Sequence, residues 1–429
     1  MIYLLFIFLV FILLIKYNIK ASFASPYLLS PDIVVLGVFL ISIIVAIFNI
    51  GKWGDISIMT FFVILFSLLL FTLGSSLSIK KGHPIHKKLP NLHISDTHTI
   101  IIILFMTIVT FLDYRDVVNL VGHAGLGLMA ISTLARETLY EDQEMVQHSF
   151  FVLQGIYASR AIAYIYMYII CYNKYINKEK FKFILLIPVL LYFSQIILST
   201  GRSEFIYLIY GFLVIGYCLK KRSTNWEKKK DFKHLKYIVI GVLFFFFLFS
   251  YTSSLRSKGN TDVIETAGHY VGSSIPAFDW YIENNGLESN AVFWGEQTQI
   301  LYHSIAKSLG ISDYKPVYTM PPCNLKNGAL TNIYTSLCRY VHDYGVLVMF
   351  IIIFLQGYIY SILFNKIKQN NSYGLRIILY SFLSYPLAEF AIDERIFSNM
   401  IGARTVYVCI YIWLFYKYLI KKDKVAVVK

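Results

Sequence analysis

Several arginines of this chain lie at the ends of long apolar runs, beside glycine or acidic residues. Arg202 follows the tripeptide Ser-Thr-Gly at 199–201 and precedes the apolar run 203–219. Backbone amides at the start of a helix bind anions, and the guanidinium group of arginine forms two parallel hydrogen bonds to phosphate. This spacing predicts a binding site for a phosphate group. The alternative is an arginine whose long side chain extends to the lipid headgroups.

A second cluster contains Arg339, His342 and Asp343 at the start of the apolar run 343–364. Because Arg339 and Asp343 are four residues apart, they lie on one face of any helix that contains both. They form either a local ion pair or a phosphate-binding arginine held in place by a carboxylate. His342 is either a general base or an ordinary surface histidine.

A third cluster lies between the apolar runs 374–392 and 399–419. Charged side chains in the hydrocarbon region cost about 2.5–3.5 kcal/mol each, so they are usually paired or functional. Glu389 and Asp393 are expected on one helix face, and Arg404 is expected about two turns inside the last run. The members of this cluster are Glu389, Asp393, Glu394, Arg395 and Arg404.

The elements that position these groups are apolar runs. Of the 429 residues, 57% are hydrophobic and only 15% are charged, whereas soluble domains carry about 25% charged residues. A helix needs roughly 17–25 residues to cross a bilayer. The runs predict an all-α, polytopic membrane helical bundle of about 11 transmembrane helices (roughly 10–12). They are 1–16, 33–50, 56–79, 97–112, 149–172, 181–198, 203–219, 236–251, 343–364, 374–392 and 399–419.

The distribution of basic residues predicts the orientation of this single membrane domain, residues 1–429. Most of the 39 Lys and Arg follow the odd-numbered runs or lie in the C-terminal tail. Short basic loops stay in the cytoplasm, so the N-terminus is expected outside and the C-terminus inside. The apolar segment 117–134 then does not cross the membrane and is expected to be re-entrant or interfacial. Two long outer segments result, 113–148 and 252–338, of which the second is expected to be partly helical.

The outer segment 252–338 adds three candidate groups. Arg256 follows the run 236–251, and His269 and Asp279 come later in the segment. Arginine binds phosphate, and histidine or aspartate accepts a proton. The predicted topology places all these clusters at the outer membrane face, so the three groups add the same chemistry on that side.

The sequence contains no motif for a nucleotide, a metal or a redox cofactor. It has no Walker-type glycine loop, no HExxH and no CxxC pair. We therefore expect no metal and no cofactor. The net charge of +14 is explained by basic cytoplasmic loops, so nucleic acid is not an expected partner. Membrane lipids are the expected partners of the lysine-rich segment 220–236.

Three segments, in this order, resemble one protein family. They are Ser199-Thr200-Gly201-Arg202-Ser203, the stretch Tyr270-Val271-Gly272-Ser273-Ser274-Ile275-Pro276-Ala277-Phe278-Asp279, and Thr331-Asn332-Ile333-Tyr334-Thr335 followed by Tyr340-Val341-His342-Asp343-Tyr344-Gly345. With the long outer segment, they look like the oligosaccharide repeat-unit polymerases, the Wzy-type O-antigen and capsule polymerases, over nearly the whole chain. The paired R-x10-G motif of some members is absent, since no arginine here has glycine eleven residues later.

The resemblance implies a reaction at the outer face of the bacterial cytoplasmic (inner) membrane. A polymerase of this family joins undecaprenyl-diphosphate-linked oligosaccharide repeat units into O-antigen, capsule or a related polysaccharide. The phosphate–sugar bond of the carrier supplies the energy, so no ATP site is needed. A chain-length regulator and a flippase are further partners that the resemblance implies.

This reaction assigns a role to each candidate residue. Cations stabilise the departing diphosphate, and the acceptor hydroxyl needs a base. The candidate bases are His342, Asp343, Asp279 and His269. The candidate diphosphate-binding residues are Arg202, expected first, and then Arg339, Arg404, Arg256 and Arg395.

Other activities use related substrates. An O-antigen-type ligase transfers finished polymer from the same carrier, and the sequence separates it poorly from a polymerase. A flippase for lipid-linked oligosaccharides usually has paired half-repeats and no long outer segment. A transporter or a purely structural membrane protein does not need aromatic-rich outer segments beside arginine-bearing helix ends.

Overall fold

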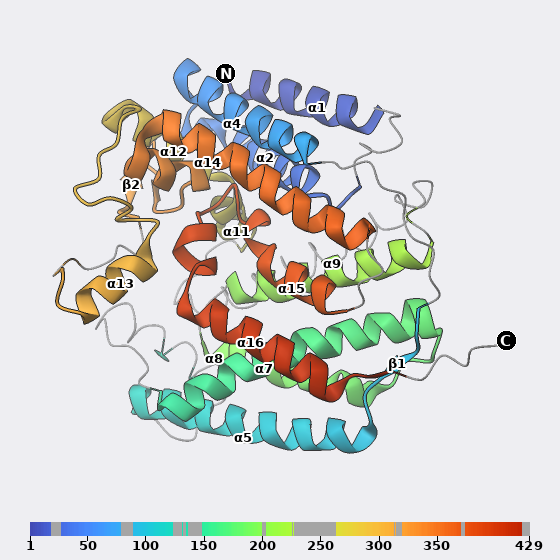
Figure 1. Ribbon diagram of the computed structural model, residues 1–429. Coiled ribbons are helices and arrows are strands. Elements are labelled where there is room, and N and C mark those ends of the chain that lie inside the picture. Colours follow the sequence, from blue (N-terminus) through green and yellow to red (C-terminus); the bar gives the residue numbers. More distant parts are fainter. Residues whose placement is uncertain are drawn as a thin grey trace. The chain divides into compact units, whose positions relative to one another are not determined.

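The computed structural model describes residues 1–18, 27–78, 89–122, 131, 134–135, 148–199, 203–224, 226, 263–312, 314, 320–369 and 374–422. These residues are mostly helical, with two small two-stranded sheets (Figure 1). The chain divides into two compact units. Unit 1 comprises Met1–His83, Ile264–Gln369 and Leu383–Thr405, and unit 2 comprises Pro84–Val263, Asn370–Phe382 and Val406–Lys429.

Four of the described helices are long and apolar enough to cross a membrane. These are α2 (Pro31–Phe48), α4 (Ile58–Leu77), α9 (Ser203–Ser223) and α14 (Ser336–Gln369). Shorter apolar helical stretches cover Ile2–Lys16, Phe183–Leu198 and Leu375–Leu387. The described part of the chain is therefore consistent with an all-α membrane protein. The predicted run 236–251 lies outside the described residues.

Unit 1 contains the helices near the N-terminus and those of the long segment 252–338. A small antiparallel sheet pairs β2 (Cys323–Asn324) with β3 (Leu330–Thr331), with Cys323 opposite Thr331. The further helical elements are α1 (Ile2–Asn18), α3 (Ile50–Trp53), α11 (Val263–Gly272), α12 (Ser274–Asn285), α13 (Ile300–Ser308), η4 (Tyr385–Leu387) and η5 (Ile396–Met400).

Helices α4 and α14 pack backbone against backbone (Figure 1). A Cβ at Gly74 of α4 would lie 2.2 Å from the carbonyl oxygen of Phe354, and a Cβ at Gly357 of α14 would lie 2.2 Å from that of Phe71. Glycine permits this approach because it has no side chain, as in other close helix pairs of membrane proteins. The pair therefore holds α14 at a fixed position on α4.

Helix α14 is interrupted at Gly345, whose φ of 74° and ψ of 167° are strained for any residue with a Cβ. At the break, Val346 N donates to the carbonyl oxygen of Leu287 at 2.9 Å and not to that of His342, four residues earlier. Ser289 Oγ donates to the carbonyl oxygens of His342 and Asp343, at 3.1 and 3.0 Å, and Asn290 N donates to that of His342 at 3.0 Å. The loop that follows α12 is therefore fixed on the broken helix.

The predicted run 374–392 is only partly helical. It forms α15 (Leu375–Leu383) and the short 3₁₀ turn η4, and the rest of the run is irregular. Pro386 has no backbone N–H, and its ring disfavours α-helical geometry at the residue before it. The α-helix therefore ends before this proline, and a non-helical segment carries the charged residues that follow.

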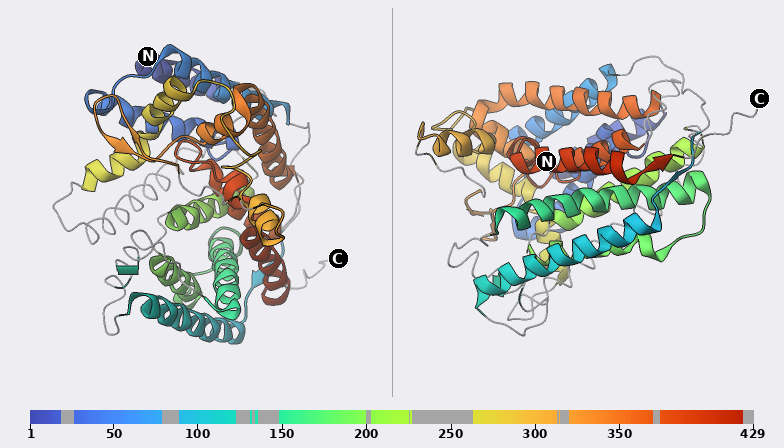
Figure 2. Two further views of the ribbon diagram at one scale, coloured as in Figure 1. Left: turned by 90° about the vertical axis from the view of Figure 1, so that its left-hand side faces the viewer. Right: turned by 60° about the horizontal axis from the view of Figure 1, so that its bottom comes forward.

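Unit 2 is built around α7 (Phe150–Tyr172), which contacts α5 (Asp96–Val121), α8 (Ile187–Leu198) and α9 (Figure 2). All side chains from Ala158 to Ile169 of α7 are buried, so this helix forms the core of the unit. Antiparallel pairing joins β1 (Leu92–His93) to β4 (Lys421–Lys422). The other elements are η1 (Asn173–Asn177), η2 (Phe183–Leu185) and most of α15 and of α16 (Ala403–Leu419).

Helix α5 is longer than the sequence predicts. It continues past the predicted run 97–112, so the predicted outer segment 113–148 begins inside a helix. Asp113 and Asp116 are buried in this extension, and His148 lies between them, 3.7 and 3.2 Å from their carboxylate oxygens. The histidine supplies both carboxylates with a polar partner, which makes their burial tolerable.

The predicted re-entrant segment 117–134 is described only in part. Its described residues contribute to a small apolar core in unit 2, formed by Val117, Ile131, Ala135 and Leu198. Residues 123–130 lie outside the described residues, so the re-entrant path stays a prediction.

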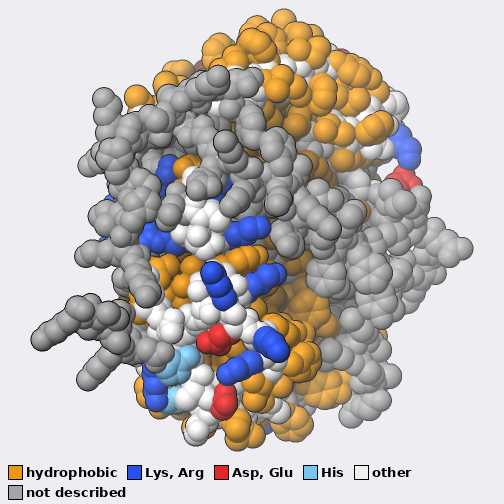
Figure 3. Space-filling model, turned by 90° about the vertical axis from the view of Figure 1, so that its right-hand side faces the viewer, with side chains coloured by type: hydrophobic (Ala, Val, Ile, Leu, Met, Phe, Trp, Pro, Cys, Tyr) orange, Lys and Arg blue, Asp and Glu red, His pale blue; other side chains and the backbone are white. Residues whose placement is uncertain are grey.

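Exposed lysines gather at one end of unit 2 (Figure 3). They lie where α7 passes into η1 and where α16 ends, and the pairing of β1 with β4 brings these places together. The lysines are Lys174, Lys178, Lys180, Lys182, Lys417 and Lys421. Two predicted cytoplasmic segments, far apart in the sequence, therefore share one basic face.

Candidate functional site

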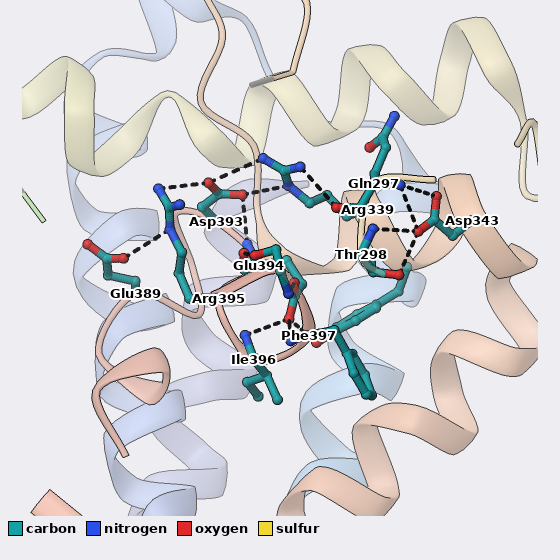
Figure 4. A network of polar contacts seen from close by, with 12 residues as sticks. Gln297, Thr298, Arg339, Asp343, Glu389, Asp393, Glu394, Arg395, Ile396 and Phe397 are labelled. Atoms are coloured by element: carbon teal, nitrogen blue, oxygen red, sulfur yellow. Dashed lines mark hydrogen bonds and ion pairs between the residues drawn. The ribbon is translucent and has the colours of Figure 1, made fainter. Parts of the chain in front are cut away.

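Unit 1 contains a chain of charged side chains of alternating sign (Figure 4). Arg395 Nε lies 3.3 Å from Glu389 Oε2, and Arg395 Nη2 lies 3.0 Å from Asp393 Oδ2. The other oxygen of Asp393 accepts from Arg339 Nε at 2.9 Å. Arg339 Nη1 also donates to the carbonyl oxygen of Gln297 at 3.2 Å. We refer to Glu389, Arg395, Asp393 and Arg339 as the ion-pair chain.

The ion-pair chain is buried at both ends, at Glu389 and Arg339, and more exposed in the middle. Arg339 is 2% exposed, whereas the side chain of Arg395 is 26% exposed. Burial alone would raise the pKa of Asp393, but the charges of Arg339 and Arg395 outweigh burial and lower this pKa below its usual value. Asp393 therefore stays ionised, and the two carboxylates neutralise the two arginines. Arg395 is the arginine of the chain that lies closer to solvent.

Glu394 shapes the backbone that carries Asp393 and Arg395. Its carboxylate accepts hydrogen bonds at 2.7, 2.8 and 2.9 Å from three successive backbone N–H groups, those of Ile396, Phe397 and Ser398. An acidic side chain satisfies helix N-termini in this way, and here it caps the π-helical turn η5. Tyr340 OH donates to the same carboxylate at 2.7 Å, which ties the turn to α14.

Asp343 does not pair with Arg339, although both alternatives from the sequence expect this contact. Its carboxylate accepts from the backbone N–H of Gln297 at 3.2 Å, from that of Thr298 at 2.8 Å and from the Thr298 hydroxyl at 2.7 Å. These donors satisfy the carboxylate, so Arg339 pairs with Asp393 instead. Asp343 therefore anchors the loop whose Gln297 carbonyl group accepts from Arg339.

His342 contacts a different part of the same loop. Helix α14 begins before the predicted run 343–364, so His342 lies inside the helix and not at its mouth. Its Nε2 atom forms a hydrogen bond with Glu296 Oε1, and its Nδ1 atom lies 3.1 Å from the Tyr281 hydroxyl. The side chain of His342 is 15% exposed. A partly accessible imidazole with a carboxylate partner is suited to general base catalysis.

The other two predicted bases lie apart from the ion-pair chain in unit 1. Asp279 is buried, accepts from Ser57 N at 2.7 Å and pairs with Lys326 Nζ at 2.8 Å. His269 packs edge-on against Trp53, with ring centroids 5.8 Å apart, and burial lowers the pKa of this histidine. The contacts of Asp279 and His269 join different helices and loops of the unit.

Arg404 lies at the start of α16 and is half-buried. The sequence predicts it two turns inside a span, but η5 and the turn after it delay the start of the helix to Ala403. Arg202 and Arg256 lie outside the described residues. Their roles in diphosphate binding stay predictions.

Unit 2 contains a buried ion pair that is not among the site residues predicted from the sequence. Arg160 Nη1 of α7 lies 3.1 Å from Glu204 Oε2 of α9, with the two side chains 5% and 12% exposed. The Arg160 guanidinium group also lies over the rings of Tyr207 and Phe382, at 5.7 and 5.0 Å from their centroids. A lone arginine in the middle of the run 149–172 is a usable signal, because charges inside a span are usually paired or functional.

Three loop residues whose contacts with α14 form part of the site are also absent from the sequence predictions. They are Glu296, Gln297 and Thr298. Polar residues are ordinary in surface loops, so this stretch carries little signal by itself. Its role becomes visible only because the break at Gly345 brings the loop onto the helix.

Among the described residues, no group of three or more His, Cys, Asp and Glu side chains is arranged to hold a metal ion. No protein-family model, no curated protein and no solved structure matches the chain. The described site therefore consists of the ion-pair chain, the His342–Glu296 contact and the loop that joins them.

Proposed function

We propose that the protein is a membrane glycosyltransferase that polymerises undecaprenyl-diphosphate-linked oligosaccharide repeat units into O-antigen, capsule or a related polysaccharide. The observation that carries this proposal is the ion-pair chain, in which a partly exposed arginine is held beside a buried one in an apolar helical protein. Buried charge is costly in such a protein, so it is usually paired or functional. The three family-like segments support the same activity.

We further propose about 11 membrane spans, with the N-terminus outside and the C-terminus in the cytoplasm of a bacterial cell. The basic face of unit 2 supports this orientation, because its lysines come from two segments that the topology assigns to the cytoplasm. The same topology assigns 252–338 to the outer side. The reaction then takes place at the outer face of the cytoplasmic membrane.

In this proposal, Arg395 contacts the diphosphate of the carrier. Arginine binds phosphate and carboxylate through the same planar pair of donors, so a diphosphate can replace Glu389 on Arg395. Arg339 is a positioning residue, because it holds Asp393 from the buried side and Asp393 holds Arg395. The cation is then in place before charge develops on the leaving group, which is how preorganised sites lower a reaction barrier.

His342 accepts the proton of the acceptor hydroxyl. Departure of the diphosphate leaves an oxocarbenium-like centre on the sugar, as in glycoside chemistry. The acceptor oxygen attacks this centre as His342 removes its proton. The phosphate–sugar bond that breaks supplies the free energy for the new linkage.

Deletion of the gene followed by gel analysis of the cell-surface glycan tests the activity. If the protein is a polymerase, the deletion strain is expected to carry single repeat units on the lipid acceptor. Carrier-bound polymer without attachment would instead identify a ligase, and complete loss of outer glycan would identify a flippase. Either of these outcomes contradicts the proposal.

Variants of Arg395 test the site. Replacement by alanine is expected to lower the polymerisation rate roughly 10²-fold, as loss of one charge-stabilising donor does in other enzymes. Arg395→Lys is expected to restore less than about a tenth of the rate, because lysine lacks the planar fork. The matched control is Arg376→Ala, which removes an exposed arginine of α15 and is expected to leave polymer length unchanged. Normal polymer from Arg395→Ala would exclude this arginine from the site.

Variants of Arg202 test the prediction that lies outside the described residues. Arg202→Lys and Arg202→Ala are both expected to abolish long-chain polymer while the protein remains in the membrane. Normal chain lengths from either variant would remove Arg202 from the list of diphosphate-binding residues.

A further inference from the structure

His342 takes part in a second chain of polar contacts, separate from the ion-pair chain. Asn290 Nδ2 donates to the Tyr281 hydroxyl at 3.3 Å. The Tyr281 hydroxyl lies 3.1 Å from His342 Nδ1, and His342 Nε2 contacts Glu296 Oε1. These four residues belong to unit 1, and they come from α12, the loop after it and α14.

The donors and acceptors of this chain fix the direction of each hydrogen bond. The carboxylate of Glu296 only accepts, so the neutral imidazole of His342 carries its proton on Nε2 and donates it to Glu296. Nδ1 is then the accepting atom of the ring, so the Tyr281 hydroxyl donates to Nδ1, and the Tyr281 oxygen accepts from Asn290 Nδ2. Burial raises the pKa of Tyr281 to about 12, so the phenol keeps this proton at neutral pH.

The backbone holds Glu296 in this position. Its second oxygen, Oε2, accepts from Val292 N at 3.1 Å and from Phe293 N at 3.4 Å. The side chains of Glu296 and His342 are 11% and 15% exposed, so water reaches the pair only partly. A carboxylate fixed in such a place orients an imidazole, selects its tautomer and stabilises the imidazolium that forms when the ring takes up a proton.

We infer that Glu296 is the positioning residue of His342, which it holds as the Nε2–H tautomer so that Nδ1 accepts the proton of the acceptor sugar hydroxyl. The inference rests on the proposed function and adds to it a residue, a tautomer and an accepting atom. The Tyr281 hydroxyl occupies Nδ1 in this structure, and the acceptor hydroxyl displaces it in the reaction.

The atoms and electrons of this step balance. The acceptor oxygen forms a bond to the anomeric carbon as the bond from that carbon to the carrier's phosphate oxygen breaks, and the electron pair leaves with the diphosphate. The acceptor proton moves to Nδ1, and the resulting imidazolium pairs with Glu296. The proton then passes to water, which restores neutral His342.

A double-variant experiment on the full-length protein in proteoliposomes tests this role. The substrate is the strain's own undecaprenyl-diphosphate-linked repeat unit, isolated from the deletion strain. Glu296→Gln keeps the shape and an acceptor oxygen for His342 but removes the charge. It is expected to lower kcat roughly 10²-fold, as loss of general base catalysis does, and to leave KM within about threefold.

His342→Gln supplies the second arm of the cycle. Because Glu296 acts through His342, the double variant Glu296→Gln/His342→Gln is expected to be no slower than His342→Gln alone. The matched control is Glu288→Gln, an exposed acid of the same loop, and it is expected to keep the wild-type rate.

Two results would overturn the inference. One is a Glu296→Gln protein whose kcat stays within about threefold of the wild type. The other is a double variant whose loss equals the product of the two single losses, since a purely structural role of Glu296 adds to that of His342. Absence of polymer from the wild-type protein would instead overturn the proposed function, and the inference with it.

Discussion

The ion-pair chain of unit 1 and the Arg160–Glu204 pair of unit 2 are two ways of placing charge inside an apolar helical protein. In unit 1, Arg395 contacts two carboxylates, and part of the ion-pair chain lies on the irregular segment 388–395. In unit 2, both charges lie on regular helices, and aromatic rings cover the guanidinium group. Buried charge alone therefore does not distinguish a reactive site from a helix–helix contact. The backbone conformation distinguishes the two, because irregular segments hold functional groups in geometries that regular helices cannot provide.

The largest effect on stability is expected from Arg339→Met. This change leaves the partly buried Asp393 with Arg395 as its remaining arginine and removes a donor from the Gln297 carbonyl group. Removing one partner of a buried ion pair costs about 3–5 kcal/mol. Denaturant unfolding in detergent micelles, followed by circular dichroism, measures the cost. Arg376→Met is the control. A loss of unfolding free energy below about 1 kcal/mol for Arg339→Met would show that the ion-pair chain contributes little to folding.

Helix packing within unit 1 also differs from helix packing within unit 2. The stability cost of Gly357→Ala is expected to reveal this difference. In unit 1, the new Cβ meets the backbone oxygen of Phe71 at 2.2 Å, whereas a Cβ at Gly155 of unit 2 meets a side-chain methyl of Val109 at 2.8 Å. A side chain can rotate away and a backbone carbonyl cannot. We expect Gly357→Ala to cost about 2–3 kcal/mol and Gly155→Ala about 1 kcal/mol.

Thermal unfolding of the purified variants measures this difference. Gly37→Ala is the control, because its Cβ meets nothing within 4 Å and alanine favours a helix over glycine by up to about 1 kcal/mol. Equal costs for Gly357→Ala and Gly155→Ala would contradict the close backbone packing of α4 and α14.

The sequence predicts some parts of this molecule well and others not at all. The helical membrane character follows from composition, because apolar runs of this length have few other stable folds. The charged clusters at 339–343 and 389–395 are visible because charge inside apolar sequence is rare, and the structure brings them together. The spacing rule that pairs Arg339 with Asp343 is wrong here, because it considers one helix and not the loop that satisfies Asp343.

The remaining features depend on contacts between distant segments, which local patterns do not encode. Glu296 reaches His342 only because α14 breaks at Gly345 and the loop after α12 binds the break. The Arg160–Glu204 pair is hard to predict for a different reason. Arg160 has no charged neighbour in the sequence, and its partner Glu204 lies on another helix. The end of α15 differs from these features, because Pro386 signals it in the sequence, although the predicted run 374–392 continues past this proline.

Gly345→Ala is expected to affect activity more than stability. The strained backbone at this position costs about 1–3 kcal/mol for a residue with a Cβ, and the Cβ meets Ser289 N at 3.3 Å. The change is therefore expected to displace the loop that holds Glu296 and to lower the polymerisation rate. Gly310→Ala is the matched control, because Gly310 also has a positive φ but its Cβ meets nothing within 4 Å. A rate that falls equally in both variants would show that strain, and not loop position, is responsible.

The smallest effect is expected from the double variant Arg160→Met/Glu204→Gln in unit 2. Replacing both members of a buried ion pair by groups of similar volume is often nearly neutral, whereas Arg160→Met alone leaves a carboxylate without its arginine. We expect the double variant to be more stable than the single variant and to make polymer of normal length. Denaturant unfolding and glycan gels of the two strains provide the measurements. Loss of polymer from a stably folded double variant would place Arg160 or Glu204 in the reaction, and the contrast between an irregular reactive site and a regular structural pair would then fail.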